Sequence, residues 1–502
     1  MIRSKLKLVV IKTFICVGII LLSSIGSQAQ KEITLDEALL IAFSNSPDII
    51  KSKINMEQNK ERLNAQLASL KSRFTLDITP ITYDKTESYN EYFSTWNTSE
   101  NKGSKGTFTV SQPIKLSDGR LSLSNEFGYQ DNFSEASSSN YAGYNNSLYI
   151  QYDQPLFTFN KTKMDLTRNE LNLENATLSY SIQMLNMERQ VNQAFYTIYQ
   201  KQMALKIAEE EFENQKVSKE IIESKVEGGL SAKEELYQAE LNYATSQSNL
   251  DNKRVDLENA KDEFKLLLGI SLYEDVAVST DIKYIPVIVN LEKAIQNGLS
   301  QRLELTQRQI DLNNARFDLI ETTAHNAFKG NVNLSVGLMG NNEQWRKVYD
   351  KPTKSPRLGV TFSIPIFDWG ERKARIRAAE LEIESREIDM NSLKNDITIN
   401  IRKIYRNLRN LIQQIEIAEQ NQKNAELTYD INLERYKNGD LTSIDLERFQ
   451  NQLSEKKMNL ANSLINYKLE LINLKIQSLW DFENNRSFVP QELQENLIKN
   501  EE

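Results

Sequence analysis

The sequence predicts an α+β membrane protein in which long antiparallel α-helical coiled-coil hairpins are combined with transmembrane β-strands. Three observations lead to this prediction. The two halves of the 502-residue chain contain matching segments, which is an internal two-fold repeat. Each half contains a very long proline-free segment with an apolar seam. Short segments of alternating apolar and polar residues precede these long segments.

The repeat is visible as matching segments at a constant spacing. Residues 33–39 match residues 289–295, and residues 154–160 match residues 364–370, the latter at an offset of 210 that also pairs Gly229 with Gly439. Two repeats cannot close a solenoid or a propeller within one chain. The expected domains are a signal peptide (1–29), a first structural repeat (30–284), a second structural repeat (285–480) and a polar C-terminal tail (481–502).

Residues 1–29 are predicted to be a cleaved secretory signal peptide. Four basic residues precede an apolar stretch at 14–22, and small residues at Ser27 and Ala29 offer a cleavage site. The apolar stretch is too short to cross ~30 Å of hydrocarbon. The only cysteine, Cys16, would leave with this segment, so the mature chain is expected to contain no disulfide.

Composition excludes several classes of function. The formal net charge of −8 argues against nucleic acid as a partner, because phosphate binding needs a concentrated basic surface. No stretch after the signal approaches eighteen apolar residues, so no transmembrane helix is expected. The chain has a single histidine, His325, and no glycine-rich phosphate loop. We therefore expect no catalytic residue, no cofactor, no metal site and no enzymatic activity.

The long segments 161–226 and 371–437 are predicted to be helices of about 100 Å each, at 1.5 Å per residue. The second one carries a seam whose steps alternate between three and four residues, as in helices that pack along their length. That seam comprises Leu393, Ile397, Ile401, Ile404, Leu408, Leu411, Ile415, Ala418, Gln422, Ala425, Tyr429, Leu433 and Tyr436. The returning helix, 442–479, has its own expected seam of Phe449, Leu453, Leu460, Leu464, Tyr467, Leu471 and Leu474. Glycine as C-cap and Thr442 as N-cap are expected at the turn.

Alternating segments predict strands with one apolar face and one polar face. Residues 332–338 and 358–364 alternate strictly, and residues 108–110, 121–123 and 148–152 repeat the pattern. Such strands suit a barrel with lipid outside and water inside. Four strands are too few for a barrel, which needs at least eight, so the chain is expected to oligomerise.

The first half of the chain has more residues between its helices than the second half. Residues 106–114 and 120–129 predict an extra hairpin, and residues 87–105 and 131–146 are expected to be polar loops. Whether the hairpin around 106–130 joins the barrel wall is left open.

The motifs, taken in order, resemble the TolC-like outer membrane efflux protein (outer membrane factor) family. The resemblance is carried by "ITLDEAL" at the repeat start, "QPLF" and "IPIFDWG" before the long helices, and "GGLSAKEEL" and "NGDLTSIDL" at the hairpin tips. It implies a homotrimeric α/β barrel tunnel in the cell outer membrane that extends into the periplasm. Its implied function is that of a passive exit duct in a tripartite efflux or type I secretion system. The implied partners are outer-membrane lipid, a periplasmic adaptor (membrane fusion) protein and an inner-membrane transporter.

The resemblance also assigns site residues at the hairpin tips. The implied adaptor-docking residues are Gly229, Leu230, Ser231, Gly439, Leu441 and Thr442. The implied pore constriction contains Glu235, Asp445 and Arg448, and Arg448 stands where some family members carry a second acidic residue. We expect Asp445 to pair with Arg448 or with a tip lysine, because like charges in a narrow ring repel.

One alternative function comes from a different class. A structural periplasmic coiled-coil envelope protein without transport activity would share the long helices. It would have no need of alternating strands, and these strands favour the duct. The exported substrate and the pump class (RND, ABC or other) are left open.

Overall fold

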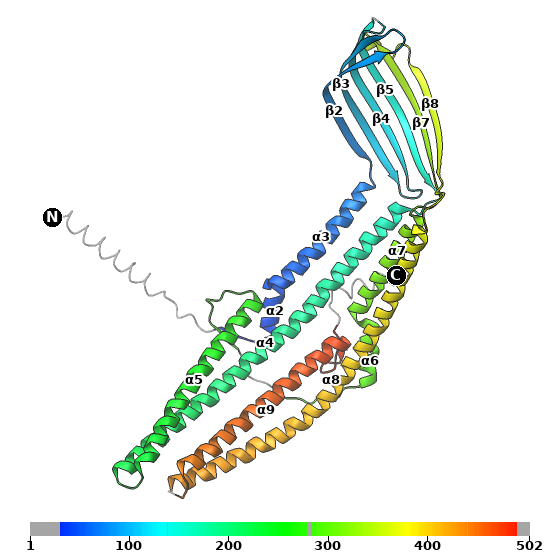
Figure 1. Ribbon diagram of the computed structural model, residues 1–502. Coiled ribbons are helices and arrows are strands. Elements are labelled where there is room, and N and C mark those ends of the chain that lie inside the picture. Colours follow the sequence, from blue (N-terminus) through cyan, green and yellow to red (C-terminus); the bar gives the residue numbers. More distant parts are fainter. Residues whose placement is uncertain (1–30, 138, 279–283, 439, 489–502) are drawn as a thin grey trace, which may run out of the picture. The chain divides into compact units, whose positions relative to one another are not determined.

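The computed structural model describes residues 31–488, except for residues 138, 279–283 and 439 (Figure 1). The predicted signal peptide (1–29) and the predicted tip residue Gly439 therefore lie outside the described residues. The chain divides into two compact units. The hairpin unit comprises Met1–Lys53, Ser179–Arg302 and Lys394–Glu502, and the sheet unit comprises Ile54–Leu178 and Leu303–Leu393.

Helices account for most of the described residues. They are α2 (Leu35–Asn45), α3 (Pro47–Ser69), α4 (Lys161–Glu227), α5 (Lys233–Leu268), α6 (Leu291–Gln301), α7 (Leu303–Ala324), α8 (Glu371–Lys437) and α9 (Ser443–Ser478), with a 3₁₀ turn at Trp345–Lys347. Within residues 31–488, apart from the gaps given above, no helix combines the length and the apolar character needed to cross a membrane.

The two long hairpins, α4–α5 and α8–α9, have identical lengths. Helices α4 and α8 both contain 67 residues, and helices α5 and α9 both contain 36. All four pairs of helix boundaries differ by the offset of 210 that the sequence shows. The equal length expected of the two hairpins is therefore confirmed, whereas the domain boundaries at 284/285 and 480/481 stay predictions.

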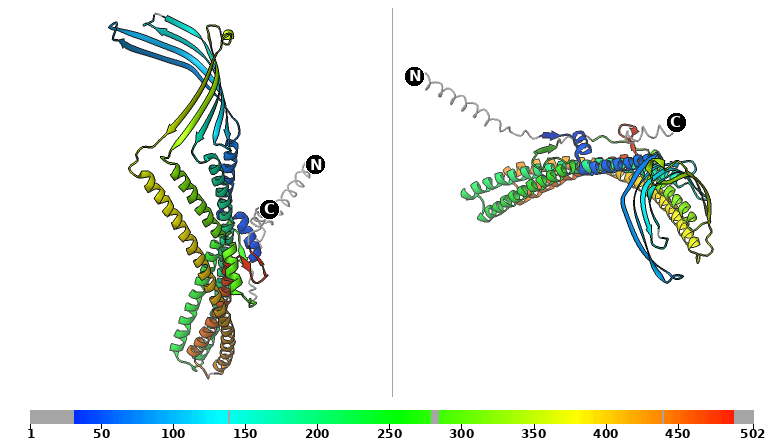
Figure 2. Two further views of the ribbon diagram at one scale, coloured as in Figure 1. Left: turned by 90° about the vertical axis from the view of Figure 1, so that its right-hand side faces the viewer. Right: turned by 90° about the horizontal axis from the view of Figure 1, so that it is seen from above.

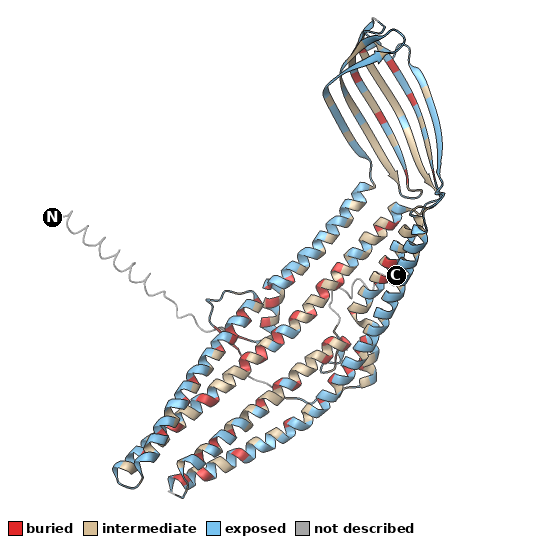
Figure 3. Ribbon diagram, in the orientation of Figure 1, coloured by how far each residue is buried: buried red, intermediate tan, exposed pale blue. Residues whose placement is uncertain are grey.

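The first hairpin packs through apolar side chains at helical spacing. Met187, Val191 and Ile198 of α4 are fully buried, and the rings of Phe195 and Phe264 meet edge to face at 6.4 Å. Buried positions recur along α4 (red in Figure 3). An apolar stripe of this kind stabilises a helix mainly through packing against its neighbours.

Helix α5 ends at a glycine for two physical reasons. Gly269 has φ +70°, a left-handed conformation that side chains other than glycine rarely adopt. A Cβ atom there would also lie 2.3 Å from the carbonyl oxygen of Asn45. The close approach lets the end of α2 pack on the end of α5, so both the backbone angle and the space require glycine.

The second hairpin uses most of the predicted seam. In α8 the seam residues Ile397, Ile401, Ile404, Leu408, Ile415, Ala425 and Tyr436 are buried. In α9 the expected seam is fully buried only in part, as it is in α8. Leu453, Tyr467 and Leu474 are buried, whereas Phe449, Leu460, Leu464 and Leu471 are half-buried. Three further residues of α9 are buried, namely Leu446, Ala461 and Ile465. Helix α9 contacts α6 as well as lying along α8, so it buries a wider face than a single seam.

The sheet unit contains one antiparallel six-stranded sheet with the order β2-β3-β4-β5-β7-β8. Its strands are β2 (Arg73–Asn90), β3 (Thr95–Ile114), β4 (Gly119–Ser134), β5 (Ser139–Leu156), β7 (Lys329–Asn342) and β8 (Thr353–Ser363). The sheet is twisted and curved (Figure 2). Two small ladders lie in the hairpin unit: β1 (Lys31–Ile33) with β6 (Val276–Val278), and β9 (Trp480–Asp481) with β10 (Arg486–Ser487).

The first half of the chain contributes more residues to β-strands than we predicted from the sequence. The hairpin at 106–130 joins the sheet as part of β3 and β4. The expected loops at 87–105 and 131–146 are largely wrong, because most of these residues extend β2, β3, β4 and β5. Strand β2 was not expected at all. Neighbouring strands satisfy the backbone of these polar stretches, as in the pairs of Lys102 with Asp131 and of Asn101 with Asn132.

The cross-strand register gives the sheet one apolar face and one polar face. One directly paired row crosses all six strands through Phe74, Val110, Leu123, Ile150, Val336 and Pro356. The next row on the opposite face contains Thr75, Thr109, Ser124, Tyr149, Gly337 and Ser355. The apolar face is largely open, since Phe74, Ile150 and Val336 each expose more than half of their surface. The predicted alternation is therefore confirmed in three dimensions.

Candidate functional site

The first hairpin tip is a glycine-capped helix end. The amide of Leu230 donates to the carbonyl of Lys225 at 2.8 Å, and the amide of Gly229 donates to the carbonyl of Val226 at 3.0 Å. This pair of bonds is the Schellman motif, which needs a left-handed residue, and Gly229 has φ +75°. A Cβ atom at Gly229 would meet no atom within 4 Å. The turn is therefore open to a partner surface.

Two of the predicted docking residues follow Gly229 directly. Leu230 is 82% exposed although it is large and apolar, and Ser231 is half-buried. An exposed leucine alone carries no information. Its place beside an open glycine turn gives the tip a small apolar surface.

The second hairpin tip repeats the same hydrogen bonding. The amide of Asp440 donates to the carbonyl of Arg435 at 2.9 Å, which is the bond of the first tip displaced by 210 residues. Gly439 lies outside the described residues. Of the remaining predicted residues, Leu441 is half-buried and Thr442 is the N-cap of α9.

The predicted constriction residues do not pair as expected within one chain. The Thr442 hydroxyl accepts from the backbone amide of Asp445 at 3.2 Å and donates to the Asp445 carboxylate at 2.7 Å. Arg448 is exposed and makes no ion pair with Asp445 in the described part of the chain. The Asp445 carboxylate is instead used for helix capping.

Glu235 occupies the matching position in the first tip, but its surroundings differ. The N-cap of α5 is Ala232, which offers no side-chain hydrogen bond to the helix start. The Glu235 side chain is exposed and forms no hydrogen bond or ion pair with the residues that the structure describes. The two tips thus present one free and one engaged carboxylate.

Beyond the tips, all four long helices line a pocket of about 170 Å³ that the sequence did not predict. Two hydrogen bonds join the hairpins there. The hydroxyls of Ser218 and Tyr436 lie 3.3 Å apart, and the Asn242 amide donates to Glu447 at 2.7 Å. Tyr436 is buried, and the Lys225 ammonium lies 5.3 Å from the centre of its ring. The polar residues bridging the hairpins are thus held at defined positions.

A carboxyl group near this pocket is sensitive to its surroundings. Burial raises the pKa of Glu211, and the negative charge of Glu447 raises it further. Lys253 opposes this shift. The preceding residue, Glu210, forms an ion pair with Lys457 of the second hairpin at 2.8 Å. The contact between the hairpins therefore contains titratable groups as well as neutral hydrogen bonds.

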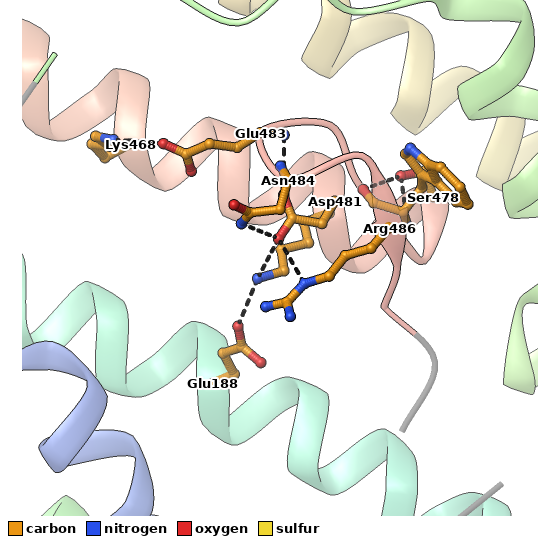
Figure 4. A network of polar contacts seen from close by, with 9 residues as sticks. Glu188, Lys468, Ser478, Asp481, Glu483, Asn484 and Arg486 are labelled. Atoms are coloured by element: carbon orange, nitrogen blue, oxygen red, sulfur yellow. Dashed lines mark hydrogen bonds and ion pairs between the residues drawn. The ribbon is translucent and has the colours of Figure 1, made fainter. Parts of the chain in front are cut away.

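A second polar cluster fixes the end of α9 to α4 (Figure 4). The Lys475 ammonium lies 3.6 Å from Glu188 and 3.3 Å from Asp481. Burial raises the pKa of Glu188. Burial alone would also raise the pKa of Asp481, but hydrogen bonds from Asn484 and the nearby Lys475 charge outweigh it and lower that pKa. Every member of the cluster is partnered, which is the pattern of a structural anchor.

The described residues contain no cluster of three or more histidine, cysteine, aspartate or glutamate side chains arranged to hold a metal ion. His325 is exposed at the end of α7.

Comparison with known proteins identifies the family of the second half. The sequence model described as "Outer membrane efflux protein" matches residues 322–476. The "Outer membrane protein TolC" of Escherichia coli (strain K12) is 23% identical over 261 residues, which cover 49% of this chain and 52% of the relative. The protein of the same name from Salmonella enteritidis is 22% identical over 256 residues, covering 49% and 51%. The chain thus spans about half the length of these curated relatives.

The similarity of the fold extends over nearly all of the chain. The Campylobacter jejuni CmeC outer membrane channel superposes with a TM-score of 0.70 at 15% identity, covering 95% of this chain and 93% of that one. VceC of Vibrio cholerae gives a TM-score of 0.66 at 14% identity, covering 89% and 97%. The open state of the Neisseria gonorrhoeae MtrE channel gives 0.61 at 12% identity, covering 90% of each. Residues 322–476 therefore match the outer membrane efflux protein family, and the chain as a whole has the fold of the TolC-like outer-membrane channels.

Proposed function

We propose that the protein is one subunit of a homotrimeric outer-membrane channel that serves as the passive exit duct of a tripartite efflux or type I secretion system. The observation that carries this proposal is the two-faced sheet joined to two equal helical hairpins. Its apolar face covers about nine residues of β4, from Leu121 to Tyr129, which is the length of a tilted strand that crosses a bilayer (~9–11 residues). Its polar face suits a water-filled interior.

The localisation follows from the same features. The matched relatives are outer-membrane proteins by name. The exposed apolar face of the sheet needs lipid or another apolar partner, since an open patch of this extent is unfavourable in water. The protein is placed in the outer membrane with an extension into the periplasm.

The hairpin tips are the proposed docking surface for a periplasmic adaptor, which connects the duct to an inner-membrane transporter. Support comes from the open turn at Gly229 and the exposed Leu230. Ser231, Gly439, Leu441 and Thr442 complete the proposed surface. Glu235, Asp445 and Arg448 are the proposed constriction, because threefold symmetry would bring three copies of each charge around one axis.

The test is dye accumulation in cells that lack the chromosomal copy of the gene. Re-expression of the wild-type chain should restore export of a fluorescent efflux substrate. An envelope-tethering protein without transport activity would instead change membrane spacing or integrity and leave energised export of the dye unaltered. Unchanged export on deletion, with an altered envelope, would contradict the duct.

A further inference from the structure

The six-stranded sheet has two free edges. Strands β2 and β8 each pair on one side only within the described residues. Unpaired backbone groups are very unfavourable in lipid, so membrane sheets close into barrels. Because all neighbours in the sheet are antiparallel and the strand number is even, β2 and β8 run in opposite directions. The β8 edge of one copy can therefore pair antiparallel with the β2 edge of another.

The two edges offer ladders of equal length. On β2 the pairing is regular from Arg73 to Thr79, and it then shifts between Thr79 and Thr82, where Pro80 lies. On β8 the segment from Arg357 to Ser363 is preceded by Pro356. Proline has no backbone N–H to give to a ladder and is a common terminator on edge strands. Each edge thus provides seven residues, counted from the end of the sheet where the chain joins a helix.

Pairing these segments with their ends flush aligns apolar with apolar side chains. Arg73 would lie opposite Ser363, and on the apolar face three pairs would form. These pairs are Phe74 with Phe362, Leu76 with Val360, and Ile78 with Leu358, and all six side chains are at least half exposed in the single chain. A slip by one residue would set each of them opposite a residue whose side chain points to the polar face.

The opposite face supplies complementary charges. In the same register Asp77 and Arg357 become diagonal neighbours on the polar face, within reach of a long side chain. Within the described chain neither residue forms an ion pair or a side-chain hydrogen bond, and both are exposed. An inter-copy ion pair would satisfy both charges.

The barrel geometry provides an independent check. In the sheet a row of direct partners runs from Arg73 through Ser111, Ser122, Gln151 and Ser335 to Arg357. The flush register carries this row on to Thr79 of the next copy, which is a stagger of six residues for six strands. With a rise of ~3.4 Å per residue and a strand spacing of ~4.8 Å, this stagger corresponds to a tilt of about 35°. Membrane barrels have tilts of ~35–45°.

We propose that three copies close an eighteen-stranded barrel in which Arg73–Thr79 of one copy pairs antiparallel with Arg357–Ser363 of its neighbour. The inference rests on the proposed function for the number of copies. The β3–β4 hairpin raises the number of strands per copy from four to six. Because barrel diameter grows roughly linearly with strand number, the barrel is about half again as wide as a twelve-stranded one. A barrel of 16–18 strands leaves an aqueous channel, so the membrane part does not limit cargo size and the filter lies elsewhere in the duct.

Register-specific disulfide cross-linking tests the proposal. Directly opposed residues have Cα atoms ~4.5–5.5 Å apart, within the range for disulfides, whereas partners displaced by two residues are ~7–8 Å apart and outside it. In a Cys16→Ser background, the pair Thr75→Cys with Thr361→Cys should give covalent trimers under oxidising conditions, and a reductant should reverse them. The displaced pair Thr75→Cys with Ser363→Cys should give at least tenfold less, and each single-cysteine variant should give none.

Particle mass is measured on the same samples so that the two proposals can be separated. Three-copy particles that cross-link in neither register, or only through the displaced pair, overturn the ladder and leave the proposed function standing. A folded chain that purifies only as a monomer overturns the proposed function and the ladder together. Covalent trimers from the flush pair alone support both.

Discussion

The two long hairpins share their lengths and their turn geometry but differ in the chemistry of their tips. Both tips close with the same backbone hydrogen bond, from Leu230 to Lys225 in the first and from Asp440 to Arg435 in the second. The returning helix starts at Ala232 without a side-chain cap in the first hairpin and at Thr442 with a hydroxyl cap in the second. The two repeats therefore share helix lengths and turn geometry. The contacts of the matching carboxylates, Glu235 and Asp445, differ.

Because of this difference, we expect the two hairpin tips to differ in rigidity. The Glu235 carboxylate is left exposed, whereas the Asp445 carboxylate is bound by Thr442. A capped helix start is the more rigid of the two, because its first amides are satisfied. We expect the first tip to adapt to a partner and the second tip to keep its shape.

The largest expected effect comes from filling both glycine turns. Gly229→Trp combined with Gly439→Trp should reduce export to the level of the deletion strain, because an indole at position 229 would project from the open turn into the proposed docking surface. Trimer assembly and membrane insertion should remain. The matched control, Gly229→Ala combined with Gly439→Ala, replaces the same two residues without the bulk. It carries left-handed strain of ~1 kcal/mol at position 229 and should retain export within about twofold. Normal export by the double tryptophan variant would show that the tips are not the docking surface.

A smaller effect is expected where the two hairpins meet. Tyr436→Phe removes the hydrogen bond to Ser218, which is worth ~0.5–1.5 kcal/mol, and should raise the open probability of the reconstituted channel about two- to tenfold. Tyr237→Phe is the control, since Tyr237 is 66% exposed. Equal open probabilities for the two variants would show that this contact does not hold the hairpins together.

Exchanging the N-cap residues of α5 and α9 should change which of the two tips is the more stable. Thr442→Ala should destabilise the second tip by ~1 kcal/mol, and Ala232→Thr should stabilise the first by up to that amount. Amide hydrogen exchange in the first turn of α5 and of α9 is the measurement. If Thr442→Ala leaves exchange at α9 unchanged, the hydroxyl cap does not distinguish the two tips.

The smallest effect is a dependence on pH. Because the folded state raises the pKa of Glu211, packing favours the protonated carboxyl. That contribution is complete below the ordinary value of ~4.3 and is lost as pH rises through the raised value. The contact between the hairpins should therefore weaken as pH rises, and open probability should be modestly higher at pH 8 than at pH 5. Glu211→Gln should abolish the difference, and a persistent difference would assign it to other groups.

The sequence predicted the framework because the framework is repetitive. The offset of 210 fixed the equal hairpins, and alternation identified parts of β5, β7 and β8 correctly. We missed β2, although Phe74, Leu76 and Ile78 alternate there with polar residues. Alternation itself failed for the outer parts of β3 and β4. In a stretch such as Glu100-Asn101-Lys102 both faces are polar, so no period of two is visible and only pairing with a neighbouring strand makes it a strand.

The turns at the hairpin tips could be predicted from the sequence, whereas the side-chain contacts between the hairpins could not. Gly229 marks the turn of the first tip, whose returning helix has no side-chain cap, and in the second tip the cap expected at Thr442 is present. The contact of Ser218 with Tyr436 joins residues from different hairpins, so no local pattern reveals it. Within one chain the Thr442 hydroxyl donates to the Asp445 carboxylate, and the expected pairing of Asp445 with Arg448 or with a tip lysine in the pore ring stays a prediction.

The most direct test of the central claim is single-channel recording on purified particles whose mass is measured by mass photometry. A trimeric duct should give three copies per particle and an ionic current across a planar lipid bilayer after reconstitution. A stable, folded monomer, or a three-copy particle that inserts into lipid without conducting, would contradict the claim that this chain is one third of a duct.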